Sequence, residues 1–149
     1  MESSDPVSAL LQHKSPDLWT AAPDDTVFDS IGLMADKNVG ALLVMDGRKL
    51  VGLFTERDYT RGVILKERSS RSTTVREIMT SDPVHVAPSD TVQHCMEIMT
   101  NQRFRHLPVV SEGEVIGLVS IGDLVKWIIS AQDALIEHLE NFILGSYPA

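Results

Sequence analysis

An internal repeat constrains this chain more than any other feature. Residues 22–64 align without a gap onto residues 87–129, and 12 of the 43 aligned positions are identical. Most of the other positions keep their apolar character, so one supersecondary unit occurs twice. A unit of this size does not bury its apolar faces alone, and 149 residues fit one compact domain. We therefore expect two units packed face to face about a pseudo-two-fold axis.

Each repeat opens with turn and capping residues, namely Pro, Asp and Thr at matched positions. Apolar residues then recur at i, i+4 and i+7, which places them on one face of a helix. They are Val27, Ile31 and Met34 in the first repeat, and Val92, Met96 and Met99 in the second. We interpret this face as core.

Two short β-type runs follow in each repeat, with turn residues between them. In the first repeat residues 41–45 and 50–54 flank Asp46-Gly47; in the second, residues 107–110 and 115–119 flank Glu112-Gly113. Such a pattern predicts a hairpin. A second helix then begins at Thr55 or Ser120, so each unit is predicted as β-α-β-β-α and the fold class as α+β.

The predicted organisation is one integrated module. We expect the first unit at residues 10–66, a polar linker at 67–74, the second unit at 75–130, and a C-terminal helix and tail at 131–149. The last helix carries one apolar stripe and is expected to end at Gly145. Because it has no counterpart after the first unit, it packs on its own module or joins a second chain, and we favour a homodimer.

Composition excludes several function classes. The net charge of −8 argues against general nucleic-acid or anionic-membrane binding, and no apolar run approaches the length that crosses a bilayer. The start of the chain lacks the features of a secretory signal. A single cysteine, Cys95, indicates a reducing compartment, which we expect to be the cytoplasm, or an organelle matrix if a targeting peptide was removed. Eight of the thirteen basic residues lie between Arg48 and Arg76, which fits either a local anion site or a solvated helix and linker.

Both repeats carry a further shared segment, at residues 52–58 and 117–123. It reads Gly, two apolar residues, Ser or Thr, two variable residues, and Asp. Ser or Thr followed three residues later by an acid is typical of a helix capping box. The same junction of strand and helix presents free N–H groups to a phosphate, and its Asp can accept ribose hydroxyls. Structural and binding interpretations are therefore both open here.

With these residues in view, the chain resembles a tandem pair of cystathionine-β-synthase (CBS) domains, a Bateman module of the stand-alone signal-transduction type. The resemblance covers about residues 15–129, and the segments TERDY, RHLPV and SIGDLV carry it together with the repeated Gly-to-Asp segment. It implies one or two sites for an adenine nucleotide: AMP first, with ADP, ATP, NAD(H) or S-adenosylmethionine as alternatives. It also implies a disc-like dimer that signals energy or redox state to a regulated partner protein.

The resemblance assigns site residues position by position. Asp58 and Asp123 would hold the ribose, and Thr55 and Ser120 would lie near the ribose or phosphate. The remaining candidates would contact the base, sugar or phosphates: Thr20, Gly40, Ala41, Leu42, Arg57, His85, Arg105, His106, Leu107, Pro108 and Ile121. Leu43 stands where the second repeat has Pro108, and Thr20 is matched by His85. The two sites are therefore chemically unequal; they bind different ligands or one stays empty.

An enzyme is the less favoured class. The five histidines form no close metal-ligand set, and the Ser/Thr-x-x-Asp segment has no adjacent base oriented by a third group. We expect no metal and no catalytic residue. The alternatives are a protein-interaction adaptor with vestigial clefts and, behind it, a weak nucleotide hydrolase.

Overall fold

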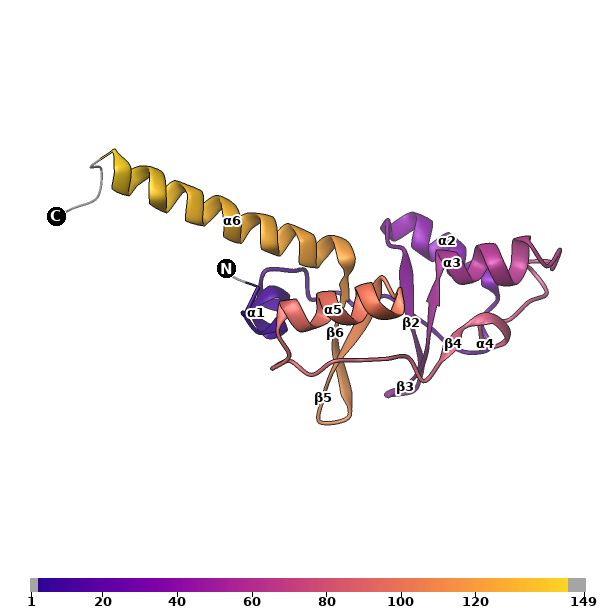
Figure 1. Cartoon of the computed structure of the whole chain (residues 1–149). Coiled ribbons are helices and arrows are strands. Elements are labelled where there is room, and N and C mark those ends of the chain that lie inside the picture. Colours follow the sequence, from indigo (N-terminus) through magenta and orange to yellow (C-terminus); the bar gives the residue numbers. More distant parts are fainter. Residues whose placement is uncertain (1–2, 145–149) are drawn as a thin grey trace. The chain divides into compact units, whose positions relative to one another are not determined.

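The computed structural model describes residues 3–144, so the expected helix end at Gly145 lies outside the described residues. The chain divides into two compact units (Figure 1). Residues 17–85 and 108–118 form what we call the first-repeat unit. Described residues 3–16, 86–107 and 119–144 form the second-repeat unit. The fold is mixed α+β with two sheets and a C-terminal helix, which confirms the predicted class.

A four-stranded sheet in the order β1-β2-β3-β4 organises the first-repeat unit. Its strands are β1 (Thr20–Ala21), β2 (Ala41–Asp46), β3 (Lys49–Thr55) and β4 (Thr80–Ser81). The helices are α2 (Val27–Lys37), α3 (Glu56–Tyr59) and α4 (Val75–Ile78), with a π-helical turn, η1 (Thr60–Ile64), after α3. The predicted hairpin forms between β2 and β3, and Gly47 in its turn has the left-handed φ of 62° that glycine tolerates.

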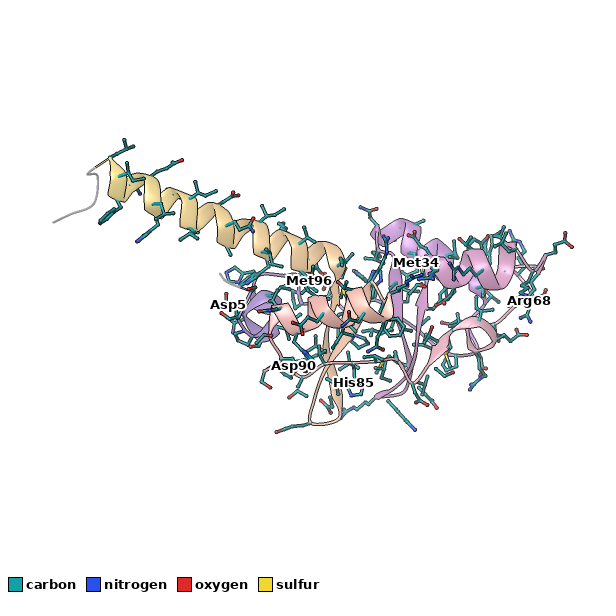
Figure 2. The ribbon with its side chains drawn as sticks, viewed as in Figure 1. Asp5, Met34, Arg68, His85, Asp90 and Met96 are labelled. Carbon is teal, nitrogen blue, oxygen red and sulfur yellow. The ribbon has the colours of Figure 1, made fainter. Side chains whose placement is uncertain are left out.

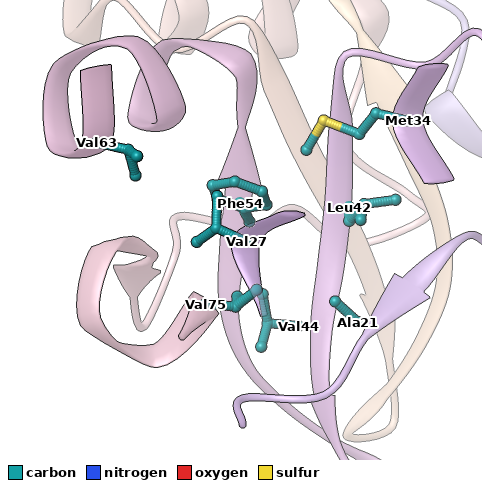
Figure 3. Packing of buried hydrophobic residues seen from close by; sticks show 8 residues of the cluster. All are labelled: Ala21, Val27, Met34, Leu42, Val44, Phe54, Val63 and Val75. Atoms are coloured by element: carbon teal, nitrogen blue, oxygen red, sulfur yellow. The ribbon is translucent and has the colours of Figure 1, made fainter. Parts of the chain in front are cut away.

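The core of this unit lies between the sheet and the apolar face of α2 (Figure 3). Val27 and Met34 are buried and Ile31 is partly buried, as the helical spacing predicts. Phe54 from β3 is fully buried in the same cluster. A second small cluster joins β2 and β3 to the outer part of the later hairpin, through Ala41, Leu43, Leu53, Val115 and Leu118.

The second-repeat unit consists of three helices and the inner part of a hairpin. The helices are α1 (Val7–Gln12), α5 (Val92–Gln102) and α6 (Ile121–Ile143). The hairpin is formed by β5 (His106–Ser111) and β6 (Glu114–Ser120), of which residues 108–118 belong to the first-repeat unit. Val92 and Met99 of α5 are buried and Met96 is partly buried, which confirms the predicted face; Cys95 is buried with them. Glu112 and Gly113 both have positive φ, as a two-residue hairpin turn requires. The counterpart of β1 is reduced to an isolated bridge at Val86.

A short helix from outside each repeat docks on the first turn of that repeat's long helix. In the first-repeat unit the amide of Val27 donates to the carbonyl of Thr73 (2.9 Å), and the amide of Val75 donates to that of Asp25 (2.9 Å). The second-repeat unit forms the same pair of bonds with α1. The amide of Val92 donates to the carbonyl of Asp5 (2.9 Å), and the amide of Val7 donates to that of Asp90 (2.7 Å). Helix α1 therefore belongs structurally to the second repeat, although it precedes the first in sequence; Asp5 and Asp90 are labelled in Figure 2.

Helix α6 runs without a break from the second repeat into the C-terminal region. We expected two helices, one from Ser120 and one over residues 131–144, but no helix-breaking residue separates them and one 23-residue helix results. Its buried side chains are Leu124 and Trp127. Beyond them Leu135, Phe142 and Ile143 are 58%, 72% and 79% exposed, and Figure 2 shows side chains standing out around this part of α6. Within residues 3–144, no helix combines the length and apolarity needed to cross a membrane.

Candidate functional site

The first candidate site lies where β3 ends and α3 begins. Thr55 is the N-cap of α3; its hydroxyl accepts from the Asp58 amide (3.1 Å), and Asp58 Oδ2 accepts from the Thr55 amide (3.0 Å). This reciprocal capping box confirms the structural interpretation of the motif. One carboxylate oxygen of Asp58 is used in the box, so the other is held at a fixed position at the helix start.

Main-chain pairing gathers the neighbouring candidates at the same sheet edge. The amide of Glu56 donates to the carbonyl of Gly40 (3.1 Å), which ties the helix start to the beginning of β2. Ala41 is paired with Thr55 across the β2–β3 ladder, and Leu42 is the next residue along β2. Thr20 pairs with Leu43 through the parallel β1–β2 ladder. The structure therefore brings Thr20, residues 40–42, Thr55 and Asp58 together.

The second candidate site repeats this junction at the end of β6. The Ser120 hydroxyl accepts from the Asp123 amide (3.1 Å), and Asp123 Oδ2 accepts from the Ser120 amide (2.9 Å). The amide of Ile121 donates to the carbonyl of Arg105 (2.9 Å). This bond is the counterpart of the bond from Glu56 to Gly40, 65 residues earlier. Arg105, His106 and Leu107 therefore lie beside the Ser120–Asp123 turn.

One contact distinguishes the second junction from the first. The ammonium of Lys14 donates to Asp123 Oδ2 at 2.6 Å, and the side chains are 35% and 27% exposed. Burial raises the pKa of Asp123, but the hydrogen bonds from Lys14 and Ser120 outweigh it, and the net pKa lies below its ordinary value. At Asp58 the balance is reversed. Burial raises its pKa more than the bonds from Thr55 and the charge of Arg57 lower it.

The sequence did not point to Lys14 as a site residue. It precedes the aligned repeat, is 109 residues from Asp123, and belongs to no motif that the repeats share. One similarity in the sequence does relate α1 to the second repeat. Both α1 and α4 begin at a valine, Val7 and Val75, whose amide donates to a carbonyl in the turn before a long helix. An alignment of these two short helices would have placed the residues after α1 beside the second repeat.

His106 is the titratable neighbour of this ion pair. Its burial lowers its pKa below the ordinary value, and the positive charge of Lys14 lowers it further, while Asp123 acts in the opposite direction. The uncharged form of the imidazole is therefore favoured. It can donate or accept a hydrogen bond without adding a charge to the site.

The remaining candidates are placed as follows. Arg57 and Arg105 are exposed, each next to its junction. His85 and Pro108 belong to the first-repeat unit, and His85 Nδ1 lies 3.3 Å from the carbonyl oxygen of Pro83. Their membership of the Asp123 group stays a prediction, as does the ligand role of every candidate residue. In the described part of the chain, no three His, Cys, Asp or Glu side chains are grouped to hold a metal.

The family is decided by the match of the repeats to a known domain. The model of the CBS domain matches the chain twice, at residues 7–64 and 75–130. The chain belongs to the CBS domain family. Its CBS pair covers α1 to the middle of α6, including both capping-box junctions.

Relatives of this CBS pair are known in sequence and in structure. The chain is 41% identical over 135 residues to the mitochondrial CBS domain-containing protein CBSX3 of Arabidopsis thaliana. This match covers 87% of the chain but 65% of that protein, so the chain spans about two thirds of its curated relative. A protein of Burkholderia ambifaria, described as a signal-transduction protein with CBS domains, is 49% identical with a TM-score of 0.83. That comparison covers 86% of this chain and 96% of the other.

A more distant structure shares the fold. CBSX2, solved in complex with AMP, has a TM-score of 0.71 at 24% identity, over 85% of this chain and 98% of that one. At this identity the likeness supports the CBS-pair fold alone.

Proposed function

We propose that this CBS pair is a regulatory module that binds an adenine nucleotide and is not an enzyme. The observation that carries the proposal is the duplicated junction. In both repeats a capping-box Asp is fixed at a helix start, and the first helical amide is bonded to the neighbouring strand. Such a carboxylate is ready to accept ribose hydroxyls, because its own position is already fixed by the fold.

Groups suited to phosphate accompany each junction. The exposed guanidiniums of Arg57 and Arg105 stand near them, and each helix start adds a partial positive charge. AMP is our first choice of ligand, as the resemblance to CBS pairs implies, and CBSX2, which shares the fold, is known in complex with AMP. ADP, ATP, NAD(H) and S-adenosylmethionine are the alternatives. Binding would bias how the CBS pair associates and so signal to a partner protein that is still to be identified.

Isothermal titration tests the binding proposal directly. The intact chain is titrated with AMP, ATP, NADH and S-adenosylmethionine, beside the variants Asp58→Asn and Asp123→Asn. Asparagine keeps an oxygen for the capping bond but removes the charge, so we expect each variant to lose about tenfold or more in affinity at its own site. Asp133→Asn, at an exposed position of α6, is the matched control. Absence of binding by all four ligands contradicts the proposal, and conversion of ATP to product would favour the hydrolase.

The exposed part of α6 supports a second function, that of an interaction surface. Leu135, Ile136 and Leu139 are each about half exposed on the same helix as the still more exposed Phe142 and Ile143. Burying such side chains is favourable, so we propose that they contribute to a homodimer. Analytical ultracentrifugation of the wild type and of Leu135→Glu/Phe142→Glu tests this. We expect a dimer for the first and a monomer for the second.

The proposed location is a reducing compartment, the cytoplasm or an organelle matrix. The relative CBSX3 is named as mitochondrial, which bears on the choice between the two. Imaging of a tagged chain in its own cells decides it.

A further inference from the structure

The ion pair between Lys14 and Asp123 lies inside the second candidate site rather than on an unrelated surface. Asp123 Oδ2 accepts at once from the Lys14 ammonium (2.6 Å) and from the Ser120 amide (2.9 Å). This is the same carboxylate that, under the proposed function, accepts the ribose hydroxyls. A ligand that reaches Asp123 must therefore share this carboxylate with Lys14.

The segment that carries Lys14 is held in place by several contacts of its own. Asp5 accepts from the Trp127 indole (3.2 Å), and the His13 ring meets the Trp127 ring edge-on with 5.3 Å between centroids. Leu10 is buried, and the amide of Val7 is bonded to Asp90. Because Trp127 follows Asp123 by one turn of α6, these contacts position the backbone of Lys14 beside the carboxylate. The ammonium itself remains on a flexible four-carbon stem that can turn to another anion.

The first site has no lysine at the matching position, and the cation whose charge acts on Asp58 is Arg57. Lys14 lies seven residues after Val7, the first residue of α1, and Asp82 lies seven residues after Val75, the first residue of α4; Asp82 is not basic. Its neighbour Ser81 is paired with Gly52 in the β3–β4 ladder. The two capping-box carboxylates thus have the same local geometry but opposite pKa shifts, raised at Asp58 and lowered at Asp123.

We propose that Lys14 makes the Asp123 site selective for anionic nucleotides, such as AMP, over the uncharged nucleoside adenosine. The proposal rests on the proposed function. A nucleoside phosphate gives each member of the ion pair a new partner: its ribose hydroxyls donate to Asp123, and its phosphate accepts from Lys14. Adenosine offers the same base and hydroxyls but no phosphate to accept from the ammonium.

The test uses the intact chain carrying Asp58→Asn, so that titration reports the Asp123 site. AMP and adenosine are compared in this background and after adding Lys14→Met, which keeps the apolar stem, or Lys14→Arg, which keeps the charge. With Lys14 present we expect adenosine to bind at least tenfold more weakly than AMP. Lys14→Met should weaken AMP about tenfold and tighten adenosine about twofold, which brings the two affinities within about threefold. Lys14→Arg should preserve most of the selectivity.

Lys49→Met is the matched control for the loss of one positive charge. Lys49 is exposed at the start of β3, outside both candidate sites, and its substitution should leave the AMP-to-adenosine ratio unchanged. Circular dichroism establishes that each variant is folded.

The outcomes separate this proposal from the proposed function. If Lys14→Met leaves the ratio of affinities within twofold of its starting value, the role of Lys14 is refuted and nucleotide binding stands. If AMP binds the Asp123→Asn variant but not the Asp58→Asn variant, the residues around Asp123 do not form a binding site. In that case too, only the role of Lys14 is refuted. If the wild type binds none of the nucleotides, the proposed function fails and this proposal falls with it. A ligand-free measurement adds a further check: carboxyl NMR should show the pKa of Asp123 rising in Lys14→Met, and an unchanged pKa refutes the ion pair.

Discussion

Val7 is the residue with which to test whether α1 truly belongs to the second repeat. It lies at the start of α1, its side chain is fully buried, and its amide is bonded to Asp90. Val7→Ala removes two methyl groups. At about 0.8 kcal/mol for each buried carbon, plus the cavity that remains, we expect a loss of about 2–3 kcal/mol in the free energy of unfolding of the second-repeat unit.

Native-state hydrogen exchange locates this loss along the chain. In Val7→Ala, a loss of about 2 kcal/mol should speed exchange about 30-fold at amides that open with the second-repeat unit, such as those of Val92 and Cys95. Val75→Ala is the matched variant, because Val75 starts α4, is fully buried, and makes the equivalent bond to Asp25. It should speed exchange at Val27 and Ser30 instead.

Gln12→Ala serves as the control on α1, since Gln12 is exposed on the same helix and its loss should leave exchange unchanged. The reasoning is refuted if Val7→Ala accelerates exchange in α2 and leaves α5 unaffected. That result would mean that α1 docks on the repeat it precedes.

Three further predictions concern packing and titration. A Cβ on Gly52 would collide with Met79 Sδ and lie 3.0 Å from the Thr80 carbonyl oxygen, so Gly52→Ala should lower the free energy of unfolding by about 1–3 kcal/mol. Gly32→Ala, on an open helix face, should raise it by about 0.5–1 kcal/mol in the same urea titration. The lowered pKa of Asp123 means that its charge stabilises the fold above the ordinary aspartate pKa and that this stabilisation is lost as pH falls through the folded pKa. Asp123→Asn should therefore reduce Tm at pH 7 by the equivalent of at most about 1 kcal/mol and have little effect near pH 2. Asp58→Asn should increase Tm at pH 7, because the folded pKa of Asp58 is raised. For either variant, an equal change of Tm at both pH values would contradict this reasoning. Burial raises the pKa of the Cys95 thiol to about 11. Alkylation by iodoacetamide at pH 8 should therefore be at least about 100-fold slower in the folded protein than in urea. Comparable rates would show that α5 is not packed as described.

Local patterns predicted the repeated elements well because each depends on residues close in sequence. The spacing of Val27 and Met34, the turn at Gly47, and the capping residues Thr55 and Ser120 all act within a few positions. The sequence predicts two helices where the structure has the single helix α6, because the aligned repeat ends within it. A repeat boundary has no physical effect on a helix without a glycine, proline or cap there.

The parts that escaped prediction depend on distant contacts or on weak local preferences. The ion pair of Lys14 joins segments that only the docking of α1 brings together. The π-helical turn at residues 60–64 has no sequence signature that separates it from a continued α-helix. The two sites differ chemically in more than the pair Thr20 and His85 that the sequence shows. The structure adds a second difference, the lysine beside Asp123.

The docking of α1 and α4 has a consequence for dissecting this chain. A fragment cut at the boundary between the repeats would separate the second repeat from α1 and leave it carrying α4, whose own bonds are made to Asp25 and Pro23 of the first repeat. Neither half would then carry the short helix that closes its first helical turn. Circular permutation keeps each short helix with its repeat, with new ends that leave α4 with residues 17–66 and a linker that joins α6 to α1, while residues 108–118 still belong to the first-repeat unit. A split-reporter assay could use the fragments that are cut between the repeats, since each fragment lacks the short helix that the other fragment carries.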